Sequence, residues 1–435
     1  MRLLRLIGCL AAIALAGCGG DDGGSAARAA LPPPASLETC SRVFYDGERS
    51  GDERAARGSG RPDVLLVSDF PLQGTYSNDG VQATHAVRLV LEEQGFRAGE
   101  HTVGYVSCDG STATDAISPA KCRHSARAYR DARSVVGVIG SMFSSCMIHQ
   151  LPITNRAGLA VAGASNTYVG LTRGGPGIAD DEPERYYPTG RRNLVRLPAP
   201  DDMQGRAHSL LAKQAGIARA FVLHDGLDAY SLGSAIGFRD AAERAGIEVV
   251  GLETWDPEAS RYGGLAREVA RSGAEAVFLG GYITSNAGPL IRALRERLGP
   301  DARLMATEAM LPVNALVSRA GDAAEGMLIT LSQLPNERLE GAGAEFLARF
   351  RERTHQDPCC YTVHVAEATH VLLDAISATD GSREAVTAAL PEVTVRDGII
   401  GSFGFDENGD VTNPLVSVYR ISGGEQVLFD VLNAP

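Results

Sequence analysis

Short apolar runs alternate with segments of helical spacing along most of this chain, in two separate series. Short apolar runs bounded by polar turns are typical of buried parallel strands, and apolar residues three or four positions apart are typical of helices. The first series has expected strands at 64–68, 102–107, 135–139 and 159–163, with helices at 78–94, at 121–130 and after residue 144. The second has expected strands at 221–224, 248–252, 276–280 and 303–305, with helices at 230–245, 265–272 and 286–298. The pattern predicts two α/β lobes, each a parallel sheet covered by helices on both faces.

The last part of the chain predicts a return to the first lobe. Three helical segments follow the second series, at 344–354, 363–376 and 383–390, and then two strands near 400–405 and 416–420. A helical block after two finished sheets indicates that several crossings join the lobes as a multi-strand hinge. The expected division is 62–198 plus 332–399 for the first lobe and 199–331 plus 400–435 for the second. Ligands of such sheets bind at the carboxyl ends of the strands, here in a cleft between the lobes.

The N-terminus predicts export. Arg2 and Arg5 precede an apolar run at 6–15 that is too short to span a bilayer, as in a signal peptide. The run ends in Leu-Ala-Gly-Cys18, which resembles a bacterial lipobox and implies cleavage after residue 17 and lipidation of Cys18. The alternative is an ordinary signal peptide that happens to contain a cysteine. The Gly-, Ala- and Pro-rich segment at 19–36 is expected to be a flexible tether within an extension that reaches residue 61.

Composition and motifs exclude several classes of function. The formal net charge of −12 argues against nucleic-acid binding. The sequence has no nucleophile elbow, phosphate-binding Walker loop or H-E-x-x-H zinc motif, so we expect neither an enzyme nor a bound cofactor. The cysteines lack the paired C-x-x-C spacing of zinc sites, so no metal site is expected.

Six cysteines remain after the signal peptide and the lipidated residue, and export permits them to form disulfides. They are Cys40, Cys108, Cys122, Cys146, Cys359 and Cys360. Cys108 ends the second expected strand and Cys146 opens the helix after the third, so these two are expected to be neighbours. Cys108 with Cys122 is the local alternative. Cys359 and Cys360 could form a vicinal bridge or each pair elsewhere.

The segment 135–167 is typical of a site that binds a small carboxylate. Ser144 and Ser145 follow one expected strand at the start of a helix, and the turn 164–167, with Ser165 and Thr167, follows the next. The first N–H groups of a helix lack intrahelical partners and favour an anion. No nucleophile with a base lies in this segment. The alternative for the two serines is helix capping alone.

Five blocks of the chain together resemble one known family. They are 68–74 (SDFPLQG), 137–145 with 163–166, 224–233, 280–282 with 307–308 and 320–328, and 403–410. These blocks are similar to the periplasmic leucine/isoleucine/valine-binding proteins, which are the type I solute-binding components of ABC importers. The resemblance extends over about 63–430 and implies the two-lobed type I periplasmic-binding-protein fold.

The resemblance also implies roles for individual residues. The Ser144 hydroxyl and nearby backbone N–H groups, with Ser145 and Thr167 as further candidates, would bind the α-carboxylate of an amino acid. Backbone atoms of Ala164 and the Ser165 side chain would contact its head group. Glu308 would pair with the ammonium, and Tyr230 and Tyr282 would close over the ligand. A buried zwitterion needs both of its charges matched, because otherwise the desolvation penalty prevents binding.

Some positions depart from the family. Asp79 stands where the family often has an aromatic ring. It is expected to be a carboxylate at a helix N-terminus, but if it faces the cleft it favours a cationic or strongly polar ligand. Tyr76 is a candidate wall residue. The segment 172–192 is longer than usual and rich in Gly, Pro and charge, which is typical of a solvated loop near the cleft mouth. The block 359–368 replaces a tyrosine-rich family segment.

Together these features predict a monomeric, lipid-anchored binding protein at the outer face of the cytoplasmic membrane. It would capture an amino acid of branched-chain type, or a related amide, and deliver it to an ABC permease. The alternative is a sensor of the same fold that reports to a membrane receptor.

Overall fold

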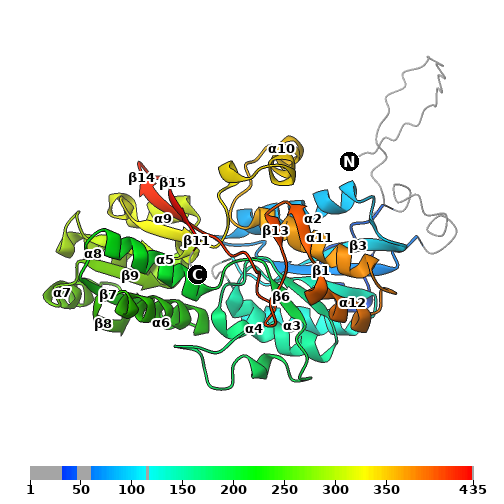
Figure 1. Ribbon diagram of the computed structural model, residues 1–435, viewed down its shortest axis with the longest axis horizontal. Helices are drawn as coiled ribbons and strands as arrows, with labels where there is room; N and C mark the ends of the chain where they lie inside the picture. Colours follow the sequence, from blue (N-terminus) through cyan, green and yellow to red (C-terminus); the bar gives the residue numbers. More distant parts are fainter. Residues whose placement is uncertain (1–31, 47–59, 114–116, 434–435) are drawn as a thin grey trace, which may run out of the picture.

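The computed structural model describes residues 32–46, 60–113 and 117–433, and these form two lobes side by side (Figure 1). The sheet of the first lobe has the strand order β2-β3-β1-β4-β5-β6. Its strands are β1 (Val64–Phe70), β2 (Arg97–Ala98), β3 (His101–Asp109), β4 (Val135–Ile139), β5 (Ala160–Gly163) and β6 (Leu194–Arg196). All of its neighbouring strands are parallel except the short β2, which pairs antiparallel with β3. The expected strands of the first series are confirmed.

Helices cover both faces of the first sheet. They are α2 (Ser77–Glu93), α3 (Pro119–Asp131), α4 (Ser144–Arg156), α10 (Ala342–Thr354), α11 (Thr362–Ser377) and α12 (Arg383–Ala389). Successive β1 side chains point to opposite faces: Leu66 packs with α2 and α11, whereas Leu65 and Val67 pack with α3 and α4. Burial on both faces explains why β1 begins with four consecutive apolar residues.

The second lobe repeats this arrangement with the strand order β15-β14-β11-β10-β9-β7-β8. Its strands are β7 (Arg219–His224), β8 (Glu248–Thr254), β9 (Ala276–Gly280), β10 (Arg303–Ala306), β11 (Leu328–Leu331), β14 (Val416–Ser422) and β15 (Glu425–Leu432). Its helices are α5 (Asp201–Gln214), α6 (Ala229–Arg244), α7 (Gly263–Arg271), α8 (Gly288–Leu298) and α9 (Val313–Ala320). The last two strands are antiparallel. The predicted α/β class with two lobes is confirmed.

The chain passes between the lobes three times: between β6 and α5, between β11 and α10, and before β14. A hairpin of β12 (Val395–Gly398) and β13 (Gly401–Phe403) precedes the last crossing. Phe403 and Val411 still pack in the core of the first lobe, so this crossing comes later than the boundary predicted at residue 400. Beside the first crossing, the fully buried Arg196 guanidinium forms a bidentate ion pair with Asp410, at 2.7 and 3.1 Å.

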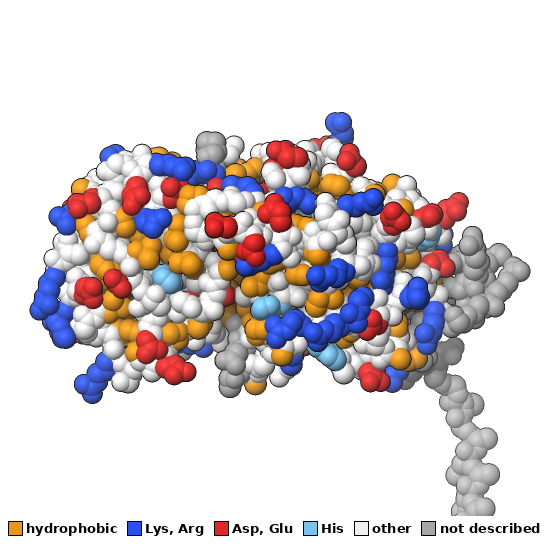
Figure 2. Space-filling view, turned by 90° about the horizontal axis from the view of Figure 1, so that it is seen from below, with side chains coloured by type: hydrophobic (Ala, Val, Ile, Leu, Met, Phe, Trp, Pro, Cys, Tyr) orange, Lys and Arg blue, Asp and Glu red, His pale blue; other side chains and the backbone are white. Residues whose placement is uncertain are grey.

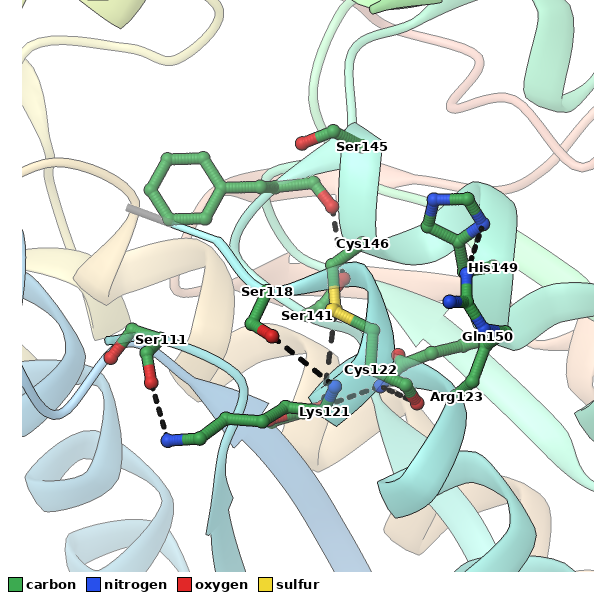
Figure 3. The surroundings of a disulfide bond; sticks show 12 residues. Ser111, Ser118, Lys121, Cys122, Arg123, Ser141, Ser145, Cys146, His149 and Gln150 are labelled. Carbon is green, nitrogen blue, oxygen red and sulfur yellow. Dashed lines mark hydrogen bonds between the residues drawn. A yellow bond between two sulfur atoms is a disulfide. The ribbon is translucent and has the colours of Figure 1, made fainter. Parts of the chain in front are cut away.

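Two disulfides lie in the first lobe, and the predicted pairings of Cys108 are wrong. Residues 41–44 run beside β3, with Ser41 N–H donating to Ser107 O at 2.8 Å, so Cys40 reaches Cys108. Helices α3 and α4 pack together, and Cys122 bonds to Cys146 across them (Figure 3). Cys108 is therefore bonded to neither of the partners considered for it from the sequence.

Cys359 and Cys360 are both free thiols, so neither the vicinal bridge nor another pairing is present. The Cys359 thiol donates a hydrogen bond to Asp79 Oδ1, at 3.2 Å. Cys360 packs instead beside Tyr361.

The segment 172–192 is folded onto the protein rather than solvated, contrary to the prediction. Tyr186 and Tyr187 are buried in the core beneath α3 and α4, whereas Arg191 is exposed. The Glu182 carboxylate accepts hydrogen bonds from the hydroxyls of Tyr168, at 2.6 Å, and Tyr186, at 2.5 Å. Gly177 lies so close to Ile236 of α6 that a Cβ would be 2.7 Å from it. The segment thus contacts both lobes, along the lower edge of Figure 1.

Charged side chains are spread over the surface. Figure 2 shows acidic and basic groups interspersed on the face seen from below, apart from a band of Lys and Arg on the half that belongs to the first lobe. Among the described residues, no helix is both long enough and apolar enough to cross a membrane. The predicted signal peptide at 1–17 and the predicted lipidated residue, Cys18, lie outside the described residues.

Candidate ligand-binding site

A cavity lies between the lobes, at the carboxyl ends of strands from both sheets. Ligand sites of such sheets are expected at this place. The walls come from both lobes and from the chain that returns to the first one. The lining residues are Tyr76, Asp79, Met142, Phe143, Ser144, Ser165, Thr167, Tyr230, Tyr282, Glu308, Ala309, Leu311, Cys360 and Tyr361.

The first lobe offers hydrogen-bond donors at the start of α4. Ser144 and Ser145 are the first two residues of this helix, so their backbone N–H groups have no intrahelical acceptor. The Ser144 hydroxyl oxygen accepts from Tyr168 N–H at 3.2 Å, which leaves its own hydrogen free to donate. The Ser165 hydroxyl already donates to Met142 O at 2.8 Å, so Ser165 supports the turn before α4 as well as lining the cavity. Donors of this kind at a helix N-terminus are suited to an anion.

The second lobe contributes Tyr230 at the start of α6, Tyr282 after β9 and Glu308 after β10. The Tyr230 hydroxyl bonds to Thr307 Oγ1 at 2.8 Å. Tyr282 is fixed at both ends, because its N–H donates to Asp225 at 3.0 Å and its hydroxyl to Asp228 at 3.2 Å. Three aromatic contacts link the rings of Tyr76, Phe143, Tyr282 and Tyr230, with successive centroids 5.0, 6.1 and 5.4 Å apart.

The glycine pair before Tyr282 has a packing reason. A Cβ at Gly281 would lie 2.6 Å from both the Asp225 carboxylate and the Trp255 ring. Only glycine allows the chain to pass this close to Asp225, whose carboxylate then orients the Tyr282 backbone.

Glu308 presents a carboxylate that lacks a full set of partners. Its Oε1 accepts from the Thr167 hydroxyl of the other lobe at 3.4 Å. Its Oε2 is buried and accepts no hydrogen bond from the described residues. Burial raises the pKa of the Glu308 carboxyl to about 7. Burial and the nearby charge of Glu308 raise the pKa of the Asp201 carboxyl well above its usual range. A cation beside Oε2 would stabilise the ionised form of Glu308 against both its desolvation and the repulsion from Asp201.

Asp79 is the second acid in the cavity wall, and it is only 4% exposed. The Cys359 thiol donates to it, and burial raises the pKa of its carboxyl to about 6. The residues that line the cavity include no Lys, Arg or His. The cavity is therefore acidic and aromatic, with neutral donors at its α4 end.

The lobes are closed on one another around this cavity. Direct hydrogen bonds cross between them: Tyr76 OH donates to Ala309 O at 3.2 Å, and Ser145 Oγ lies 3.4 Å from Tyr282 OH. Tyr76 packs into the core of the second lobe, whereas Tyr230 and Tyr282 pack against first-lobe residues. Closure of this kind removes water from a bound molecule and replaces it with protein contacts.

All of the binding residues predicted from the sequence line the cavity except Ser145 and Ala164. Ser145 points past the cavity toward Tyr282, and Ala164 is fully buried in the core of the first lobe. Asp79 lies in the first turn of α2, as expected, and it also lines the cavity, which is the alternative left open from the sequence. Sequence reasoning missed Met142, Phe143, Ala309, Leu311, Cys360 and Tyr361. The first four lie within three residues of predicted ones, whereas Cys360 and Tyr361 belong to the block 359–368, which the sequence marked only as a departure from the family.

One group in the first lobe has metal-ligand geometry. Asp69, Cys122 and Cys146 each offer one ligand atom, and these lie within 4.8 Å of one another. The two sulfurs form a disulfide, however, and metal binding by cysteine requires thiolates. Asp69 is instead held by Gln150 Nε2 at 2.6 Å.

Two α/β lobes, three crossings and a closed cavity at the strand ends define a two-lobed binding protein. The chain belongs to the periplasmic binding protein family, whose sequence profile matches residues 70–425. The family consists of solute-binding proteins that act outside the cytoplasm and are not enzymes, which agrees with the absence of catalytic motifs.

Individual proteins are similar to this chain at lower identity. The leucine-, isoleucine-, valine-, threonine- and alanine-binding protein of Pseudomonas aeruginosa is 28% identical over 53% of this chain and 61% of its own length. This chain therefore spans less than two thirds of that relative. An amino acid binding protein of the same organism is 26% identical over 69% of this chain and 75% of its own length. A leucine-binding protein of Thermotoga maritima has the same fold, with a TM-score of 0.72 and 22% identity over 85% of this chain and 99% of its own.

Proposed function

We propose that this protein captures an amino acid, or a related amide, in the cavity between its lobes and delivers it to an ABC importer. The observation that supports the ligand class best is the pairing of unsatisfied groups across the cavity. Ser144, whose N–H has no intrahelical acceptor, lies at one wall with the Ser145 N–H next to it in the chain, and Glu308, whose Oε2 is unpartnered, lies at another. A zwitterion placed between them has its carboxylate and its ammonium both matched.

The relatives support the same reading. Two of them are named for binding amino acids, and one of these names includes leucine, isoleucine and valine. The family resemblance of the binding blocks agrees with this, so a branched-chain amino acid is the class expected from relatives. The residues that would contact the ligand are Ser144, Ser165, Thr167, Tyr230, Tyr282 and Glu308.

A thermal-shift screen of the full chain against amino acids, amides, short diacids and polyamines tests the proposal. A specific ligand at a hundred times its dissociation constant stabilises the folded state by about 2.7 kcal/mol. We expect such stabilisation from at least one α-amino acid and none from the diacids, because the cavity already contains two carboxylates. A flat response to every amino acid and amide would contradict the proposal.

We further propose that Cys18 carries a lipid that holds the protein at the outer face of the membrane, and that the protein acts as a monomer. Replacing Cys18 with Ala should release the protein from the membrane fraction and leave ligand binding unchanged. Persistence of the Ala variant in the membrane fraction would contradict lipid anchoring at this residue.

A further inference from the structure

The charges around the cavity do not balance for a simple neutral amino acid. Asp79 and Glu308 both line it, and no lining residue is a cation. An α-amino acid brings one ammonium and one carboxylate. Glu308 would take the ammonium, and the neutral donors at the start of α4 would take the carboxylate, so Asp79 would remain unmatched. A buried carboxylate without a cation or several donors is costly.

Asp79 has no structural role that would account for its charge. It lies in the first turn of α2, yet no backbone N–H of that turn donates to it, so it does not cap the helix. No ion pair to Asp79 occurs among the described residues. Its hydrogen-bond donors are the Cys359 thiol, at 3.2 Å, and the side chain of the neighbouring Asn78, both of which are uncharged, and a thiol is a weak donor.

The backbone holds Asp79 firmly in the cavity wall. A Cβ on the next residue, Gly80, would lie 1.8 Å from Pro71 O, so the start of α2 is pressed against the end of β1. Gln82, one turn further along α2, accepts from Cys359 N–H at 2.8 Å and fixes the segment that faces Asp79. The packing of α2 thus places Asp79 at the cavity, where it is only 4% exposed.

Aromatic rings surround the same end of the cavity. Tyr76 and Phe143 meet edge to face with centroids 5.0 Å apart, and both line the cavity with Asp79. Aromatic faces attract cations, and this attraction strengthens when water is excluded. A carboxylate with aromatic neighbours is a suitable environment for an ammonium or guanidinium group.

We propose that the ligand carries a second positive charge at the end of its side chain, and that Asp79 binds this charge. The ligand class is thus an α-amino acid with a cationic side chain, and Asp79 determines specificity for it over an aliphatic amino acid. This inference rests on the proposed function, because it assigns the second end of the same cavity. An aliphatic side chain would leave the Asp79 carboxylate desolvated and unpaired.

L-ornithine and L-norleucine give a matched test, because their side chains have the same number of heavy atoms and end in an ammonium and a methyl group. Titration calorimetry on the full chain should show tighter binding of L-ornithine, roughly 10- to 100-fold. Asp79→Asn keeps the size of the side chain and removes its charge, so it should abolish this preference. Asp301→Asn, at an exposed position of the second lobe, is the matched control and should retain it.

The outcomes separate the two proposals. If L-norleucine or L-leucine binds as tightly as L-ornithine, the inference about Asp79 is overturned and the amino-acid function stands. A preference for L-ornithine that persists in Asp79→Asn also overturns it. If no amino acid binds at all, the proposed function itself fails. Should Asp79→Asn not fold, Asp79→Ser replaces it, and the wild-type comparison of the two ligands already decides the ligand class.

Discussion

Glu308→Gln distinguishes a role in ligand binding from a role in folding. We expect this substitution to weaken ligand affinity and to leave the stability of the unliganded protein equal or higher. Glutamine keeps the shape of the side chain and can still accept the Thr167 hydroxyl bond, but it presents no negative charge to a ligand ammonium. Removing one partner of a buried ion pair costs about 3–5 kcal/mol, since the other charge stays desolvated. The dissociation constant for an amino acid should therefore rise roughly 10²- to 4 × 10³-fold.

Without ligand, the same substitution should not destabilise the protein. Burial raises the pKa of Glu308 from 4.5 to about 7, so the folded state disfavours the ionised form. This penalty is absent below pH 4.5 and grows as the pH rises to about 7. A shift of one pKa unit corresponds to about 1.4 kcal/mol, which gives an upper limit of about 3 kcal/mol at pH 8. The Gln variant should be at least as stable as the wild type there.

The pH dependence of binding gives a third readout. The wild-type affinity should increase as the pH rises from 5 to 8, because the carboxylate must be ionised to pair with an ammonium. With L-norleucine, whose side chain carries no charge for Asp79, the Gln variant should show no such increase. Titration calorimetry measures the affinities and urea unfolding measures the stabilities, with Glu296→Gln on the exposed side of α8 as the matched control. Unchanged affinity in a Gln variant of normal stability would refute the role assigned to Glu308.

Two further predictions concern stability. Replacing both cysteines of a disulfide with Ser should cost about 4 kcal/mol for Cys40–Cys108 and about 3 kcal/mol for Cys122–Cys146, because their sequence separations are 68 and 24. Urea unfolding measures both, and a larger loss for the shorter loop would contradict this ranking. Burial raises the pKa of Asp69 from 3.8 to about 7, so its ionised form destabilises the folded state increasingly from pH 4 to pH 8. Relative to wild type, the free energy of unfolding of Asp69→Asn should increase by up to about 4 kcal/mol between pH 4 and pH 8. A stability difference that does not depend on pH would count against ionisation of Asp69 as its cause.

The sequence was sufficient to predict the two-lobed fold, because buried parallel strands are apolar at nearly every position. Strand β4, for example, is buried along its whole length and is recognisable as an uninterrupted apolar run. The edge strand β15 was not predicted, since its residues alternate between exposed and half-buried and include several charges. Helix α5 was also missed, because it starts with two acidic residues and contains Gly205 among its first turns.

Contacts between distant segments were harder to predict than elements. The pairing of Cys40 with Cys108 depends on the path of residues 41–44 along β3, which no local pattern indicates. The placement of Tyr361 in the cavity depends on the second crossing between the lobes, where Gln333 Oε1 accepts from Tyr361 N–H at 2.9 Å. Such contacts are set by tertiary packing and not by the neighbours in sequence.

The predicted binding residues meet because they follow strands of two parallel sheets whose carboxyl ends face each other. Ser144 and Ser165 follow β4 and β5, and Tyr282 and Glu308 follow β9 and β10. Their positions in the sequence, directly after expected strands, were therefore sufficient to predict that these four residues line the cavity. The orientation of Asp79 depends on how α2 packs against Pro71, and a sequence pattern does not show this.

The central claim is that the closed lobes hold an amino acid with its carboxylate at the start of α4 and its ammonium at Glu308. A crystal structure of the full chain grown with the tightest-binding amino acid of the screen tests it most directly. We expect the carboxylate within hydrogen-bond distance of the Ser144 and Ser145 N–H groups and the ammonium beside Glu308 Oε2. A ligand bound outside this cavity, or bound with its two ends reversed, would contradict the account.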